Sequence, residues 1–164
     1  YKIDTPWKIT FEAGKHGPKT PVVWSQLKDW MNSENDSIKY FSGQAVYETT
    51  FTLEKLPQKS LYIDLSNVMV MAKVTLNGQY VGGVWTFPYR LNVTEYLKKG
   101  DNTLEVTVVN NWQNRLIGDQ HLPEDQRMTW TTINPWKADS PLQSSGLLGP
   151  VEIHTFDYEI VKLE

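Results

Sequence analysis

Apolar and polar residues alternate along most of the chain, which is the pattern of half-buried β-strands. In the segment 43–54, Ala45, Tyr47, Phe51 and Leu53 fall on one face, and polar residues fall on the other. The same alternation recurs in segments 7–11, 61–65, 72–76, 79–85, 102–109 and 151–163. Seven or eight short strands separated by turns predict an antiparallel β-sandwich, so we expect an all-β fold.

Three local signals refine this prediction. Asn77-Gly78 separates two strand segments and predicts a type I′ hairpin turn, because both central residues of that turn need positive φ. The apolar phase slips between Ile153 and Phe156, which predicts a bulge or a change of sheet. Helix is scarce, with two turns expected in 24–31 and a single turn in 93–100.

Two long stretches, residues 13–42 and 111–148, have no regular period. Loops of this length inside a compact domain are usually functional or packed against something. The second stretch begins in the polar run NNWQNRLIGDQ (110–120), whose amides can bond to backbone groups in irregular turns. We expect an Arg115–Asp119 ion pair across a tight loop, with Gly118 supplying an unusual backbone angle. We also expect this run to pack against SGLLGPV (145–151).

Composition removes several classes of function. The 164 residues have a formal net charge of −3 and no concentrated basic patch, so a nucleic-acid surface is not expected. No run of 18 apolar residues is present, so no membrane span is expected. The absence of cysteine excludes disulfides, thiolate nucleophiles and cysteine-ligated zinc. The chain begins at Tyr1 rather than Met, so we expect a piece of a longer protein or a processed product.

Segments 40–53, 61–119 and 144–154 resemble the galactose-binding-domain-like β-sandwich, a jelly roll found in large glycoside hydrolases. The matching features are a strand leading into LNG, then VG, an aromatic-proline segment and GDNTLEVTVVN, as in family 2 glycosidases. NRLIGD and SGLLGPV are narrower features, and they are similar to the C-terminal sandwich of glycoside hydrolase family 106, the α-L-rhamnosidases.

This resemblance implies that residues 1–164 form one sandwich domain from the C-terminal part of a larger enzyme. Hydrolysis in such enzymes belongs to a separate barrel domain, so the implied role is non-catalytic: structural support, carbohydrate binding, or both. The implied partners are carbohydrate and the parent's own catalytic domain. The implied setting is extracytoplasmic, in a bacterium. A stand-alone carbohydrate-binding module and a self-contained glycosidase remain as alternatives.

Candidate catalytic and metal-binding groups are poorly arranged in the sequence. Glycoside hydrolysis generally needs two opposed carboxylates, and the carboxylates of the second long stretch are better explained as solvating it or pairing with nearby cations. The three histidines are scattered without zinc-ligand spacing. Residues 32–37 (NSENDS) offer oxygens of the kind that calcium prefers, although an ordinary polar turn has the same composition. We therefore predict no catalytic residue, and calcium as the only conceivable cofactor.

Sugar binding is the functional prediction with most support from residue type. The chain has seven tryptophans and eight tyrosines, and flat aromatic faces together with a few fixed polar groups suit a sugar ring. Alternatively, these tryptophans cover the open end of the sandwich or face another domain. The predicted carbohydrate-binding residues are Trp85, Tyr89, Trp112, Asn114, Arg115, Asp119, Trp130 and Trp136.

Overall fold

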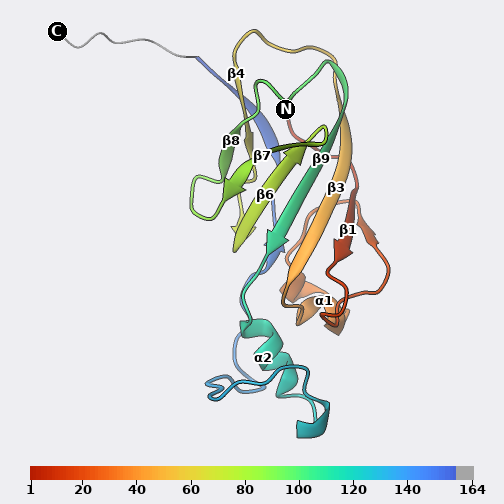
Figure 1. Ribbon diagram of the computed structural model, residues 1–164, viewed down its shortest axis with the longest axis vertical. Helices are drawn as coiled ribbons and strands as arrows, with labels where there is room; N and C mark the ends of the chain where they lie inside the picture. Colours follow the sequence, from red (N-terminus) through yellow and green to blue (C-terminus); the bar gives the residue numbers. More distant parts are fainter. Residues whose placement is uncertain (158–164) are drawn as a thin grey trace, which may run out of the picture.

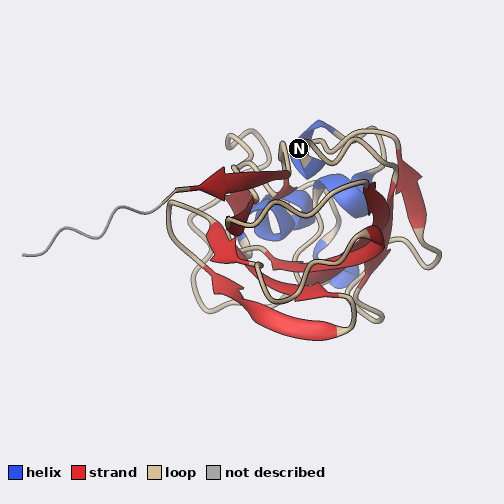
Figure 2. Ribbon diagram, turned by 90° about the horizontal axis from the view of Figure 1, so that it is seen from above, coloured by secondary structure: helices blue, strands red, loops and turns tan. Residues whose placement is uncertain are grey.

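The computed structural model describes residues 1–157 and is an antiparallel β-sandwich, as predicted (Figures 1 and 2). One sheet has six strands, in the order β2 (Val22–Trp24), β1 (Trp7–Phe11), β3 (Gln44–Leu53), β9 (Gly100–Val109), β6 (Met71–Leu76) and β7 (Gln79–Val84). The facing layer consists of a three-stranded sheet and a two-stranded sheet. Their strands are β11 (Glu152–Phe156), β4 (Ser60–Asp64) and β8 (Arg90–Asn92), then β10 (Gly146–Leu147) and β5 (Val68–Met69).

The residues that the alternation predicts to face inward form the core of the sandwich. Every second residue of β3 is buried, including Ala45, Tyr47, Phe51 and Leu53, and β1 follows the same rule. The predicted hairpin turn is also confirmed, because Asn77 and Gly78 have φ of 53° and 77°. Strand periodicity and turn chemistry therefore fix most of the sandwich.

The phase slip near the C-terminus does not produce a bulge within β11, because β11 pairs with β4 in an uninterrupted register. Phe156 instead lies on the outer face, where its ring meets Tyr62 edge-on with centroids 5.0 Å apart. The apparent slip in the apolar pattern therefore arises because Phe156 is an apolar residue on the outer face of an unbroken strand. The part of the predicted segment from residue 158 onward lies outside the described residues.

Helix forms later than the sequence predicts. Trp24 belongs to β2, and the first helical turn is the 3-10 turn η1 (Trp30–Asn32), followed by α1 (Asp36–Lys39). Asp29 explains the shift, because its carboxylate caps η1 by accepting from the Met31 backbone N–H at 3.0 Å. The single turn expected in 93–100 is present, with a Leu97 N to Val93 O hydrogen bond of 3.1 Å.

A buried polar contact joins three elements through the core. The Trp30 indole N–H donates to the Tyr47 hydroxyl at 2.6 Å, and the same oxygen accepts from the Leu147 N–H at 3.1 Å. The Trp30 and Tyr47 rings lie parallel within 3°. Since buried donors without partners are costly, this hydroxyl fixes the position of η1 and β10 relative to β3.

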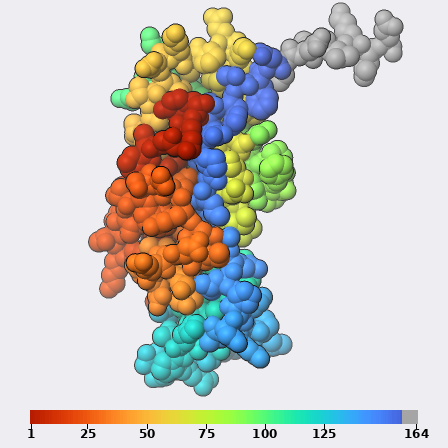
Figure 3. Space-filling view, turned by 180° about the vertical axis from the view of Figure 1, so that it is seen from behind, coloured from red at the N-terminus to blue at the C-terminus, as the bar shows by residue number. Residues whose placement is uncertain are grey.

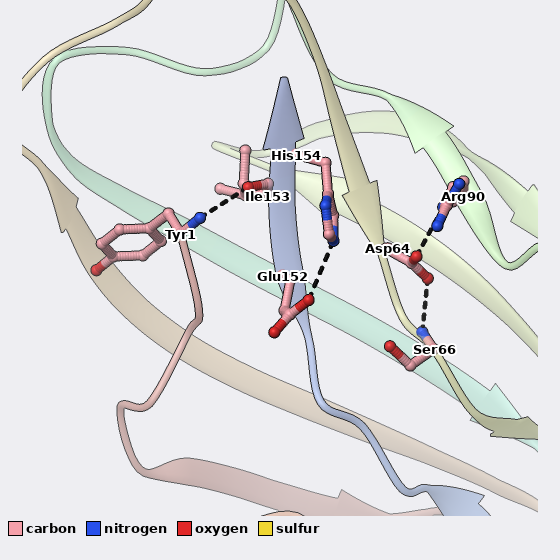
Figure 4. Close-up of polar contacts among 7 residues, drawn as sticks. All are labelled: Tyr1, Asp64, Ser66, Arg90, Glu152, Ile153 and His154. Atoms are coloured by element: carbon pink, nitrogen blue, oxygen red, sulfur yellow. Dashed lines mark hydrogen bonds and ion pairs between the residues drawn. The ribbon is translucent and has the colours of Figure 1, made fainter. Parts of the chain in front are cut away.

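Polar contacts also organise the smaller sheet (Figure 4). The Tyr1 amino group donates to the Ile153 carbonyl at 2.9 Å, so the first residues run beside β11. On β4, the Asp64 carboxylate accepts from the Arg90 guanidinium at 2.7 Å and from the Ser66 N–H at 2.8 Å. None of these residues lines the groove described below, so they serve the scaffold.

The second long stretch forms a separate lobe at one end of the sandwich, which we call the extension (residues 111–145). It contains α2 (Gln113–Asp119) and the 3-10 turn η2 (Glu124–Gln126). Figure 1 shows it below the sheets, and Figure 3 shows it beside the segment that includes α1. The N-terminus and the C-terminal end of β11 lie at the opposite end of the sandwich (Figure 1).

Candidate functional site

A groove of about 570 Å³ lies where the extension meets the sandwich. We call it the end groove. Three regions far apart in sequence line it: the loop after β1, the segment leading into β3, and the end of β9 with the extension. The pairing of β1 with β3 and of β3 with β9 brings these regions together. Its position thus follows directly from the order of strands in the larger sheet.

Two of the predicted sugar-binding tryptophans line the end groove. The residue surface of Trp112 is 63% exposed and that of Trp130 is 83% exposed. An indole costs free energy when left in water, and its flat face can pack against the C–H groups of a sugar. Both rings are available to a ligand because neither is covered by the described chain.

The charged groups of the end groove are two cations, Lys15 and Arg115, and one carboxylate, and an imidazole, His16, lies among them. Lys15 and His16 come from the loop after β1, and the guanidinium of Arg115 comes from α2. Glu12 is the only carboxylate among the groove's described lining residues, and its Oε2 already accepts the Gln44 N–H at 3.1 Å. Sequence reasoning missed the contribution of the loop, because residues 13–42 carry no periodic signal that places them here.

Arg115 and Asp119 form the predicted ion pair, with Nη2 and Oδ1 3.0 Å apart. They lie one turn apart on a helix, however, and not across a tight loop as predicted. Both side chains are buried, at 7% and 2% exposure, and the Asp119 Oδ2 accepts from the Thr129 backbone N–H at 2.8 Å. The pair therefore holds the irregular segment of the extension that carries Trp130.

Gly118 has a different role from the predicted one. Its backbone is helical, and a Cβ there would lie 2.6 Å from both the Arg115 Nη2 and the Tyr40 Cγ. Glycine is required because Tyr40 packs directly against α2, and no unusual backbone angle is involved. The residue is thus a close-packing position between the extension and the segment after α1.

Asn114 joins the two ends of the extension. It is fully buried, donates to the Gln143 carbonyl at 2.6 Å and accepts from the Gln143 N–H at 2.8 Å. Its amide also lies 3.3 Å from the Ser145 hydroxyl, and Asn110 approaches the same hydroxyl at 3.4 Å. The predicted packing of NNWQNRLIGDQ against SGLLGPV is therefore confirmed, whereas Asn114 does not line the end groove.

The other predicted sugar-binding residues lie outside the end groove. Trp85 is 71% exposed in the loop between β7 and β8, and Tyr89 is half-buried against the core. Trp136 is half-buried in the extension, where its backbone N–H donates to the Asn134 Oδ1 at 3.0 Å. Asp119 is buried behind Arg115 and does not line the groove. The structure thus gathers Trp112, Arg115 and Trp130 and separates the remainder.

The polar segment 32–37 is occupied with capping. Asn35 Oδ1 accepts from the Ser37 N–H at 3.0 Å at the start of α1, and Ser33 Oγ accepts from the Asn35 N–H at 3.2 Å. Within residues 1–157, no group of three or more histidine, aspartate or glutamate side chains is arranged to hold a metal ion. Two of the oxygens that the sequence offers to calcium, those of Ser33 and Asn35, are thus engaged by the chain itself.

Comparison with known proteins identifies the family. The sequence model of the glycosyl hydrolase 2 galactose-binding domain-like family matches residues 24–140. The chain belongs to this family. The resemblance to the sandwich domains of large glycoside hydrolases is thereby confirmed.

Individual relatives agree with this assignment. A protein of Formosa agariphila named "Putative beta-glucuronidase" is 43% identical over a 159-residue alignment that covers 81% of this chain and 14% of that protein. The solved rhamnosidase from Novosphingobium sp. PP1Y is 40% identical, with a TM-score of 0.85 over 93% of this chain and 14% of the rhamnosidase. A β-glucuronidase from an uncultured Clostridium sp., 18% identical with a TM-score of 0.55 over 67% of this chain and 22% of its own, shares the fold.

The chain therefore spans about one seventh of the length of the Formosa agariphila protein and of the Novosphingobium rhamnosidase. Within residues 1–157, no helix is long and apolar enough to cross a bilayer.

Proposed function

We propose that this domain is a non-catalytic accessory part of a larger glycoside hydrolase, and that its end groove binds carbohydrate. Family membership and the small share of each relative that the chain covers support accessory status. An α-L-rhamnosidase-like parent is the best single assignment, because the rhamnosidase is the relative that matches nearly the whole chain at 40% identity.

The observation that carries the proposal is the lining of the end groove. Its two exposed tryptophans suit a sugar ring, yet only one described carboxylate, Glu12, faces the cavity. Hydrolysis by the usual mechanism needs an acid and an opposed base or nucleophile. The groove is thus suited to holding a saccharide, and its lining within residues 1–157 offers no second carboxylate of the kind that cleavage requires.

Two assays on the 164-residue chain test this function. Incubation with nitrophenyl α-L-rhamnoside and nitrophenyl β-glucuronide should release no nitrophenol above the buffer blank. A glycan array should show binding that disappears in Trp130→Ala and persists in Trp85→Ala, whose exposed indole lies outside the groove. Turnover of either glycoside by the chain alone would contradict accessory status, and an array without any signal would contradict carbohydrate binding.

A second function, structural support of the parent, is favoured by a separate surface. Tyr80, Trp85 and Phe87 are 63%, 71% and 76% exposed on β7 and the loop that follows it. Large apolar side chains gathered on an edge strand are typical of a surface that contacts another domain. In the full-length parent, Trp85→Ala with Phe87→Ala should lower the melting temperature of the catalytic domain without changing saccharide binding.

We also propose that the parent is a bacterial enzyme that works outside the cytoplasm, where polysaccharide substrates are found. Cell fractionation of the source organism, with an antibody against this domain, tests the location. Recovery of the protein in the cytosolic fraction would contradict it.

A further inference from the structure

We propose that the end groove selects an acidic saccharide, one that bears a carboxylate or sulfate group, over the neutral sugar of the same stereochemistry. This inference rests on the proposed carbohydrate binding and adds the chemical class of ligand. It rests on the cationic side chains that line the groove and on N–H donors there that have no hydrogen-bond partner in the described chain.

Arg115 supplies the first observation. Its side chain is 7% exposed and lines the groove, and its Nε is buried without a hydrogen-bond partner. A guanidinium has five N–H donors, and its one ion-pair contact among the described residues is Asp119. That contact lies at ion-pair distance but lacks hydrogen-bond geometry. The Nε itself lies beyond the reach of a ligand, but the part of the Arg115 side chain that lines the groove presents positive charge to an anion there.

Lys15 and His16 supply the second observation. Both are exposed side chains that line the groove, and neither has a hydrogen-bond or ion-pair partner within residues 1–157. Their loop holds His16 at a φ of 61°, a left-handed conformation that few residues other than glycine adopt. The loop thus presents two unpaired nitrogen-bearing side chains beside Arg115, at a fixed backbone position.

The carboxylates nearby do not cancel this charge towards a ligand. Asp119 lies behind Arg115 with both oxygens turned to the chain, one towards Arg115 and one towards Thr129. Glu12 lines the groove with its charge intact, so it offsets one of the two lining cations, Lys15 and Arg115, and leaves the other. A ligand anion would therefore meet Lys15 and Arg115, while its ring would lie on Trp112 or Trp130. Charge-assisted hydrogen bonds of this kind are roughly twice as strong as neutral ones.

Isothermal titration of the 164-residue chain tests the proposal with matched pairs of probes. Trigalacturonate and triglucuronate are compared with their own methyl esters, which keep every sugar ring and remove the charge. A 6-O-sulfated galactotriose is compared with the unsulfated trisaccharide, which distinguishes sulfate from carboxylate as the source of charge. At least one charged probe should bind about tenfold more tightly than its neutral partner, an advantage that falls as salt is raised.

Two variants locate the binding, and each has a control of similar exposure. Lys15→Ala should weaken the charged probe about tenfold and leave the neutral partner unchanged, while Lys99→Ala, outside the groove, should change neither. Trp130→Ala should weaken both probes, while Trp85→Ala should weaken neither.

Equal affinity for the acid and its neutral partner would overturn the acidic selection and leave the proposed carbohydrate binding in place. Wild-type affinity in both groove variants would overturn the location. Absence of binding by every probe would overturn the inference together with carbohydrate binding, and accessory status would then rest on structural support alone. Intact near-ultraviolet circular dichroism in each variant confirms that loss of binding is not loss of fold.

Discussion

The buried ion pair of α2 makes a quantitative prediction about the extension. Asp119→Asn preserves an oxygen for the Thr129 N–H but removes the negative charge, and its amide group would face the donors of Arg115. The guanidinium is then a buried cation without a counter-charge. Removing one partner of a buried pair typically costs about 3–5 kcal/mol of unfolding free energy. The low exposures of Arg115 and Asp119, 7% and 2%, place this pair in the buried class.

The double variant Arg115→Met with Asp119→Asn separates charge from packing. Removing both charges leaves no buried ion, and the asparagine oxygen still accepts from Thr129. Replacing a complete buried pair is often close to neutral, so the double variant should lie within about 2 kcal/mol of the wild type, well above Asp119→Asn alone. Asp125→Asn, an exposed carboxylate of the same extension, is the matched control and should change stability by less than about 0.5 kcal/mol.

Urea unfolding followed by tryptophan fluorescence measures these differences. With a slope of about 2 kcal/mol per molar urea, a loss of 4 kcal/mol moves the midpoint by about 2 M. Hydrogen exchange of the extension shows whether the loss is local or global. The reasoning is refuted if the double variant is as unstable as Asp119→Asn, or if Asp119→Asn unfolds at the same urea concentration as the Asp125→Asn control.

Two further predictions concern tight packing and pH. Gly118→Ala should lose about 1–3 kcal/mol, since its Cβ would meet the Tyr40 ring at 2.6 Å. Gly78→Ala, where nothing lies within 4 Å but φ is +77°, should lose about 1 kcal/mol from backbone strain alone. A Gly118→Ala variant with the melting temperature of the wild type would contradict the packing argument. Burial raises the pKa of the Tyr47 phenol above its ordinary value, so stability that is complete below about pH 10 should be lost as pH rises further, by up to about 1.4 kcal/mol per pH unit. Urea midpoints between pH 8 and 11 test this loss, and a Tyr47→Phe variant with the same alkaline slope would show that the phenol is not responsible.

The sandwich could be read from the sequence because strand burial repeats every second residue. The alternation in 43–54 marks β3, and Asn77-Gly78 marks the hairpin between β6 and β7, without any knowledge of distant residues. The extension could not be read in this way. At seven residues, α2 is too short to display an amphipathic period. Its position depends on hydrogen bonds between Asn114 and Gln143, 29 residues apart.

The end groove was only half predictable for the same reason. Tryptophan content pointed to Trp112 and Trp130, but Lys15 and His16 come from a loop without periodicity. That loop meets α2 only because β3 pairs with both β1 and β9. Trp85 was grouped with the site because aromatic residue type alone does not distinguish one surface from another.

The residues that hold the end groove differ from those that would touch a ligand, and this separation has a consequence for binding. Asn114 and Asp119 are buried and bonded to the chain, while Trp130 is 83% exposed. Because buried contacts already order the groove, ligand binding does not carry the additional free-energy cost of ordering a loop. Substitutions at Trp130 should therefore change affinity with little change in stability, whereas substitutions at Asn114 should change both. If Asn114→Ala were destabilising yet bound saccharide with wild-type affinity, the extension would not be the element that shapes the groove.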